Sequence, residues 1–297
     1  MKPASFDYHA PRSIEEVVDL LGRYGSDARI LAGGQSLVPL MNMRMASPDV
    51  LISINHCPSL AFIGDRGDGV EIGARTRQIE VEKSDRIGRT CRLLRKAMPF
   101  VGSTANRNRG TVCGSLAHAD PSAELPAVAV ALDAQFLVNG PRGERRVGAS
   151  DFFVSELTTC VEADEYLQSV TMPVDPPRSG SAFTEVGPRA HGFAIAGVAA
   201  RVELDGAGRC LEARLAGIGF ASCAIRITPA ERLLAGSDLS AEAVLEAGNA
   251  AAAFVEPGSD IHADAAYRKH LAGVLVVRAL HEAAAEARAR AHSMAEG

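Results

Sequence analysis

The sequence predicts a mixed α/β protein with more than one structural unit. Its 297 residues exceed the roughly 100–150 that one hydrophobic core usually organises, which suits two or three domains, or one large α/β domain with appendages. The N-terminal half alternates short apolar runs with helical patterns, and a proline-rich stretch then leads to longer apolar runs and alanine-rich segments. With 47% hydrophobic and 23% charged residues, the chain is a folded protein rather than a disordered or collagen-like one.

Periodicity and turn residues define the elements of the N-terminal part. Ser13 and Glu16 form a capping-box pattern, which predicts a helix over residues 13–24 that ends at Gly25. The apolar run 28–32 predicts a buried strand that leads into a glycine turn. Further strands are expected at 50–54, 70–74, 134–138 and 166–172, and helices at 89–98 and at 122–132, the second opened by Asp120-Pro121.

The composition changes near residues 173–180, where prolines and a glycine predict a linker and a domain boundary. Two long apolar stretches follow, at 193–204 and 210–220. The Asp205-Gly-Ala-Gly208 segment between them predicts an antiparallel hairpin. Residues 241–254 and 265–290 are alanine-rich and helical by pattern.

Charge and hydropathy narrow the class of protein. The formal net charge is −5 and the pI is about 5.9, which argues against a dedicated binder of nucleic acid or anionic membranes. No apolar run approaches the ~20 residues that span a bilayer. The N-terminal residues also lack the apolar core of a signal peptide. We therefore expect a cytoplasmic protein without a membrane span.

The six cysteines are too far apart for the usual metal sites. No two of them lie closer than thirteen positions, whereas iron–sulfur clusters and structural zinc draw on closely spaced pairs. We expect no metal site on this chain, and no disulfide in a large cytosolic protein.

Two glycine turns carry most of the functional signal. Ala32-Gly33-Gly34-Gln35-Ser36 follows a predicted strand, and Arg109-Gly110-Thr111-Val112-Cys113-Gly114-Ser115 comes about eighty residues later. Glycines let the backbone approach a ligand closely, and successive N–H groups can form a nest for an anion. Each turn alone is adequately explained as a chain reversal, but the pair indicates a diphosphate.

The established nucleotide fingerprints are absent. Gly67-Asp-Gly-Val-Glu-Ile-Gly73 misses the G-x-G-x-x-G spacing by one residue, and no P-loop motif occurs. We also find no nucleophilic triad or placeable pair of carboxylates, and so predict no catalytic residue. His118, Asp120 and Glu124 cluster after the second turn. Helix capping and ligand contact explain them equally well, and Glu124 would suit ligand hydroxyls as an acceptor.

A basic stretch between Arg86 and Arg109 has seven basic residues and no acidic one. A nucleic-acid face would have this pattern. A solvated helix face, a partner-docking surface or compensation for a bound diphosphate explains it as well, and the acidic net charge favours these three.

The two turns, in their wider context, resemble the FAD-pyrophosphate motifs of the medium subunit of molybdenum hydroxylases. The matching segments are Leu31-Ala-Gly-Gly-Gln-Ser-Leu-Val-Pro-Leu40 and the longer run Arg107–Pro126. This family includes xanthine dehydrogenase, aerobic carbon monoxide dehydrogenase and bacterial dehydrogenases of N-heterocycles. Phe6-Asp-Tyr8, Asp49–Ser53 and Tyr267–Leu271 extend the likeness over essentially the whole chain.

The resemblance implies an α+β fold. Residues 1–176 would form a two-subdomain FAD-binding fold of the vanillyl-alcohol-oxidase type, with subdomains at about 1–55 and 56–176. Residues 177–290 would form a C-terminal domain with a three-stranded antiparallel sheet and a helical bundle. Residues 291–297 would be a frayed tail.

The resemblance also implies a set of cofactor contacts. Around the pyrophosphate it places Leu31, Ala32, Gly33, Gly34, Gln35, Ser36, Leu37, Thr111, Val112, Cys113, Gly114 and Ser115. His118, Asp120 and Glu124 would line the cofactor, with Leu167 and Phe193 near the flavin. The sequence departs from the family at Cys113, which is usually glycine, and at Phe193, where a relative has a tyrosine against the flavin ring.

The function implied by the resemblance is electron relay. A large partner would carry the molybdenum cofactor and a small partner two [2Fe-2S] clusters, in a dimer of heterotrimers. This chain would pass electrons through FAD to an external acceptor during hydroxylation of a small substrate, with an N-heterocycle favoured. Alternatives are a carbon monoxide dehydrogenase medium subunit, a self-contained FAD oxidoreductase, or a non-catalytic module that binds nucleotides or nucleic acid.

Overall fold

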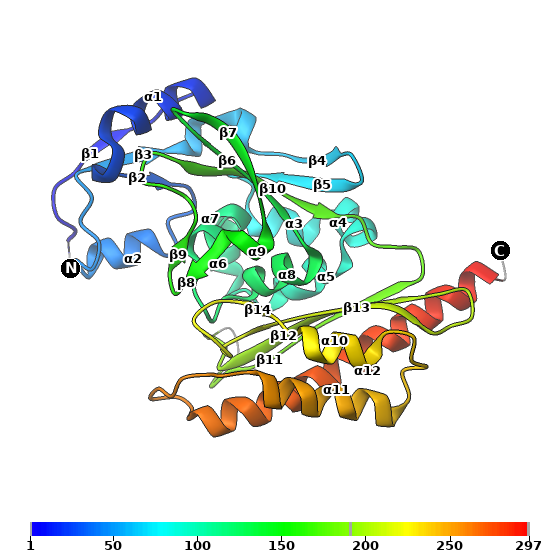
Figure 1. Ribbon diagram of the computed structural model, residues 1–297. Helices are drawn as coiled ribbons and strands as arrows, with labels where there is room; N and C mark the ends of the chain where they lie inside the picture. The colour runs from blue at the N-terminus through cyan, green and yellow to red at the C-terminus, as the bar shows by residue number, and fades with distance from the viewer. Residues whose placement is uncertain (1, 190–191, 296–297) are drawn as a thin grey trace.

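The computed structural model describes residues 2–189 and 192–295, which fold into stacked layers (Figure 1). Three parallel strands form a small sheet in the order β1-β3-β2: β1 (Asp7–His9), β3 (Val50–Ser53) and β2 (Ala28–Leu31). An antiparallel sheet in the order β4-β5-β10-β6-β7 follows, with β4 (Ile63–Arg66), β5 (Gly69–Gly73), β10 (Tyr166–Pro173), β6 (Gln135–Gly140) and β7 (Gly143–Gly148). The strands predicted in this part of the chain are confirmed.

Helix α1 (Ile14–Tyr24) packs against β3 of the first sheet and β6 of the larger one, with Val17 and Leu21 buried. The Ser13 hydroxyl accepts from the Glu16 N–H at 3.2 Å, as the capping pattern predicts. The reciprocal bond of a capping box is replaced, because the Glu16 carboxylate accepts from the Arg12 N–H at 2.7 Å.

Beneath the larger sheet lies a helical layer (Figure 1). It consists of α3 (Gln78–Lys83), α4 (Asp85–Thr90), α5 (Arg92–Ala97), α6 (Thr104–Arg109), α7 (Val112–His118) and α8 (Glu124–Leu132). The prediction of a single helix over 89–98 is wrong, because Cys91 is not helical and separates α4 from α5. The backbone N–H of Arg92 donates to the carboxylate of Asp175 at 2.7 Å, a contact from 83 positions away that sequence periodicity does not register.

Helix α8 begins later than the Asp120-Pro121 signal suggested. The Asp120 carboxylate accepts from the Ser122 N–H at 2.8 Å and forms a tight turn, so the helix starts only at Glu124. All nine of its residues are buried. It packs against the larger sheet on one side and against the C-terminal sheet on the other.

The C-terminal sheet is antiparallel, in the order β11-β12-β13-β14: β11 (Ser179–Val186), β12 (Ala196–Leu204), β13 (Cys210–Ile218) and β14 (Ile225–Arg226). The hairpin predicted around residues 205–208 joins β12 to β13. Three long strands are present as expected, and the two-residue β14 adds a short fourth. β11 begins inside the stretch interpreted as a linker, because its first residues are already paired with β12.

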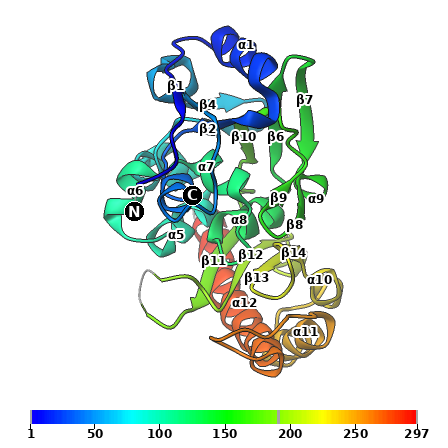
Figure 2. The same ribbon diagram turned by 90° about the vertical axis from the view of Figure 1, so that its left-hand side faces the viewer.

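Both faces of this sheet are covered, which explains the long apolar runs (Figure 2). Along β12, Val198, Ala200 and Val202 belong to the core shared with α10 (Thr228–Leu234), α11 (Ala241–Phe254) and α12 (Ala265–Ala295). Ala199 belongs to the core that contains α8. Helix α12 runs to Ala295, through most of the segment expected to be a frayed tail, and residues 296 and 297 lie outside the described residues.

Much of the basic stretch at 86–109 is used within the fold. The Arg92 Nε and Lys96 Nζ atoms both lie 2.8 Å from carboxylate oxygens of Glu286 on α12, and Arg107 Nε lies 2.7 Å from Glu82. Arg86 pairs with Asp65. The first two pairs join α5 to α12, the third joins α6 to α3, and the last joins α4 to β4, so these four basic residues are engaged within the fold.

In the parts of the chain that the structure describes, we find no helix with the length and apolar character needed to cross a membrane.

Candidate cofactor-binding site

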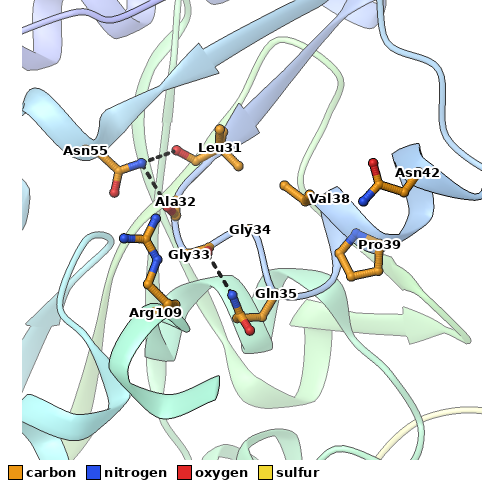
Figure 3. Close-up of a pocket in the computed structure, with 10 residues that line it drawn as sticks. All are labelled: Leu31, Ala32, Gly33, Gly34, Gln35, Val38, Pro39, Asn42, Asn55 and Arg109. Atoms are coloured by element: carbon orange, nitrogen blue, oxygen red, sulfur yellow. Dashed lines mark hydrogen bonds between the residues drawn. The ribbon is translucent and has the colours of Figure 1, made fainter. Parts of the chain in front are cut away.

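The site begins at one edge of the parallel sheet. Strands β2 and β3 run side by side in the same direction, so the residues that follow them meet at the same edge. After β2 comes the first glycine turn, residues 32–36, which leads into α2 (Leu37–Asn42), and after β3 comes Asn55. The Asn55 side-chain amide donates to the Ala32 carbonyl oxygen at 3.0 Å and to the Leu31 carbonyl oxygen at 3.4 Å (Figure 3).

The structure brings the two glycine turns into direct contact. A Cβ atom on Gly33 would lie 2.5 Å from the carbonyl oxygen of Arg109 and 2.7 Å from the Cα of Gly110. Gly34 has φ +72°, which favours glycine. Asn106 on α6, the helix before the second turn, donates from its side-chain Nδ2 to Gln35 Oε1 of the first turn at 3.1 Å.

A cavity of about 350 Å³ opens beside this contact (Figure 3). It is lined by Leu31, Ala32, Gly33, Gly34, Gln35, Val38, Pro39, Asn42, Asn55 and Arg109. Five of the predicted site residues, Leu31 to Gln35, are therefore at the cavity. The side chain of Arg109 supplies a positive charge there. Close-packed glycine backbone, a cationic side chain and a cavity of this size fit the diphosphate part of a dinucleotide.

The second turn is organised by the start of α7. The Thr111 hydroxyl accepts from the Gly114 N–H at 3.0 Å, and a Cβ on Gly114 would lie 2.6 Å from that oxygen. The side chains of Val112 and Cys113 point into the core, so only their backbone could face a ligand. Cys113 lies within the right-handed helix, its thiol 3.5 Å from the Ile72 carbonyl oxygen. Its departure from glycine is therefore accommodated without backbone strain.

The three polar residues after the second turn have different surroundings. His118 ends α7 and is half-buried, and Asp120 is engaged in its turn with Ser122. Glu124 is buried at the start of α8. Burial, with smaller contributions from the charges of Glu185 and Asp120, raises its pKa to about 8. At neutral pH Glu124 is therefore mainly protonated and can donate a hydrogen bond, whereas the sequence suggested only an acceptor.

The two residues expected near the flavin lie outside the cavity. Leu167 on β10 is buried in the large core beside Val138. Phe193 is 77% exposed, in the segment before β12 and next to residues 190 and 191, which the structure does not describe. The contacts proposed for Ser36 and Leu37 fall at the first turn of α2, next to the cavity residues.

Sequence reasoning missed Asn55 and the arginines around it. Arg77 donates to Asn55 Oδ1 at 2.6 Å, and Arg75 donates to the Asn55 carbonyl oxygen at 3.1 Å. The signal for Asn55 was available, since it follows a strand parallel to the one before the first turn. The arginines carried no such signal, because they follow β5, a strand of the other sheet.

Both halves of the chain match families of known proteins. Residues 4–175 match the FAD-binding domain in molybdopterin dehydrogenase, and residues 181–283 match the C-terminal domain of the carbon monoxide dehydrogenase flavoprotein. The chain belongs to this family. Its N-terminal domain is an FAD-binding domain. The chain is a medium subunit of an oxidoreductase of the molybdenum hydroxylase family.

Relatives of known name align over nearly their full length. The 6-hydroxypseudooxynicotine dehydrogenase complex subunit alpha of Paenarthrobacter nicotinovorans is 40% identical and covers 99% of both chains. The carbon monoxide dehydrogenase medium chain of Hydrogenophaga pseudoflava is 37% identical, covering 95% of this chain and 98% of the relative. A solved structure of carbon monoxide dehydrogenase from the same organism superposes with a TM-score of 0.92 at 38% identity, over 98% of this chain and 99% of the other. These neighbours confirm the predicted α+β fold.

Proposed function

We propose that this flavoprotein subunit holds the diphosphate of FAD where its two glycine turns meet. The observation that carries the proposal is the contact of Gly33 with Arg109 and Gly110 beside a cavity that bears a cationic side chain. Leu31 to Leu37 and Thr111 to Ser115 contribute mainly backbone groups. His118, Asp120 and Glu124 line the next part of the cofactor, and Leu167 and Phe193 lie toward the flavin. The FAD-binding unit ends near residue 176.

Bound flavin supplies the redox chemistry, and the chain supplies binding and electrostatics. We propose that electrons come from [2Fe-2S] clusters on a small partner, which takes them from a large partner with the molybdenum cofactor, and go to an external acceptor. The support for this division is that the chain matches an FAD-binding domain and that its named relatives are single subunits or chains of dehydrogenases. All six cysteines of the chain are free. A dimer of heterotrimers and a cytoplasmic location, consistent with free thiols, are part of the proposal.

The substrate class we propose for the holoenzyme is an N-heterocycle. The support is the 40% identity to a subunit of 6-hydroxypseudooxynicotine dehydrogenase. The second candidate, oxidation of carbon monoxide, is supported by the 37% identity to a carbon monoxide dehydrogenase medium chain. Co-purification with both partners, followed by assay with carbon monoxide and with pyridine and purine compounds, separates the two.

The binding proposal is tested by titrating the purified apo chain with FAD and with FMN while flavin fluorescence is recorded. FMN lacks the diphosphate bridge, so we expect FAD to bind much more tightly. A preference for FMN would overturn the proposal. The electron route is tested by adding substrate to the FAD-loaded chain with and without its partners. Bleaching of the flavin by substrate in the isolated chain would favour a self-contained oxidoreductase.

A further inference from the structure

A single arginine side chain connects the two glycine turns. Arg77 lies at the N-terminal end of α3, between the residue that holds the first turn and the backbone of the second. We propose that Arg77, acting through Asn55, is a positioning residue that sets the spacing of the two turns before the diphosphate arrives. This inference rests on the proposed function, because the turns are taken to bind FAD.

The first half of the link is Asn55. Its side-chain N–H groups hold the carbonyl oxygens of Leu31 and Ala32 and the hydroxyl of Ser53, the last at 3.0 Å. Its side-chain oxygen accepts from Arg77 Nη2 at 2.6 Å. Because one planar amide carries all these bonds, a shift of Arg77 is transmitted to the backbone that enters the first turn.

The second half of the link is the other arm of the same guanidinium. Arg77 Nη1 donates to the carbonyl oxygen of Arg109, the atom that a Cβ on Gly33 would meet first. The backbone around Arg77 is fixed to the second turn as well, through a β-bridge to Thr111 and a bond from the Gln78 N–H to the Gly110 carbonyl at 2.9 Å. A planar guanidinium can serve two acceptors in fixed directions, whereas one ammonium group lacks that fork.

The positive charges of Arg77 and its neighbouring arginines also bear on which ligand the turns bind. Burial lowers the pKa of Arg77, and the nearby charges of Arg109 and Arg75 lower it further, while Glu80 acts in the opposite direction. Arg75 and Arg77 donate to amide oxygens rather than to carboxylates, so these bonds leave both charges unneutralised. Three guanidinium groups gathered at the junction of the turns favour an anion of more than one charge.

The experiment compares Arg77→Met, Arg77→Lys, Asn55→Ala and the double variant Arg77→Met/Asn55→Ala with the wild-type chain. FAD affinity is measured by fluorescence titration, and hydrogen exchange of the amides of residues 32–36 is measured on the apo chain. Arg29→Met is the matched control. It removes an exposed positive charge from β2, the strand before the first turn, where the arginine bonds only local carbonyl oxygens.

We expect Arg77→Met and Asn55→Ala each to weaken FAD binding about tenfold or more and to speed exchange at residues 32–36, because a charge-assisted bond is lost. The double variant is expected to be little worse than either single variant, since both interrupt one link. Arg77→Lys keeps the charge and should still bind weakly, and Arg29→Met should behave as wild type.

Wild-type affinity in Arg77→Lys would show that charge alone matters and would overturn the inference. Unchanged exchange in Arg77→Met would also overturn it, whether or not the wild-type chain binds FAD. Faster exchange in the variants combined with no FAD binding by the wild-type chain would uphold the link between the turns and refute the proposed function instead.

Discussion

At Gly33 the backbone of the first turn touches the backbone of the second, and no side chain fits between them. Gly33→Val would place its Cβ only 2.5 Å from the Arg109 carbonyl oxygen, so the turns must separate. We predict that this variant keeps its fold and loses at least about tenfold in FAD affinity, a loss of about 1.4 kcal/mol or more. Titration with FAD checks this. Gly206→Ala, in an open hairpin turn with nothing within 4 Å, is the control and should bind FAD normally.

The buried carboxyl group of Glu124 leads to a second prediction, about how the stability of the fold depends on pH. Its pKa is about 8 in the folded chain against an ordinary value of 4.5, so the folded state binds a proton more tightly than the unfolded state. The carboxyl group therefore costs stability increasingly as pH rises from about 4.5 to 8. Glu124→Gln should be more stable than wild type by on the order of 2 kcal/mol at pH 9, with a smaller difference at pH 5. Urea unfolding of the apo chains at both pH values measures this, and a gain that is larger at pH 5 would contradict it.

Between elements, two carboxylates of α12 pair with α5: Glu282 contacts Lys96, and Glu286 makes the larger number of contacts. Glu286 contacts Arg92 and Lys96 and also accepts from the Ser181 N–H at 3.0 Å. Glu286→Ala removes one carboxylate partner from each of the two basic side chains and the side-chain acceptor of the Ser181 N–H, and we predict a loss of about 2 kcal/mol in the free energy of unfolding. Glu246→Ala, at an exposed position on α11, should change it by less than about 0.5 kcal/mol. Equal effects in the two variants would argue against the ion-pair network.

Elements also show where sequence reasoning succeeds and where it fails. The strand at residues 28–31 and the turn after it were predictable, because an apolar run and a pair of glycines follow one another locally. The break at Cys91 was not, since the Arg92 amide is drawn to Asp175 by contacts that exist only after folding. The same reason explains why Arg77 was missed, because its bond to Asn55 joins segments 22 positions apart and leaves no periodic pattern. Asn55 itself carried a signal, since it follows a predicted strand as the first glycine turn does.

For the molecule as a whole, the pairing of the basic stretch has a measurable consequence. Arg92, Lys96 and Arg107 are engaged by carboxylates, and the net charge is −5. We predict that labelled DNA and RNA oligonucleotides bind more weakly than about 10⁻⁴ M at physiological salt, the weak end of non-specific affinities. Fluorescence anisotropy checks this. Micromolar binding that weakens with salt would restore the interpretation of residues 86–109 as a nucleic-acid face.

Helix α8 is buried along its whole length, and the core that contains it extends from the larger N-terminal sheet to Ala199, Ala216 and Ile218 of the C-terminal sheet. The two sequence domains thus share one hydrophobic helix. Unfolding of either the N-terminal or the C-terminal domain would expose one face of α8 to water. It would also remove packing contacts from the domain that remains folded. The chain should therefore denature in a single cooperative calorimetric transition, and a fragment that ends at Pro176 should be prone to aggregate because α8 would lie bare on one side.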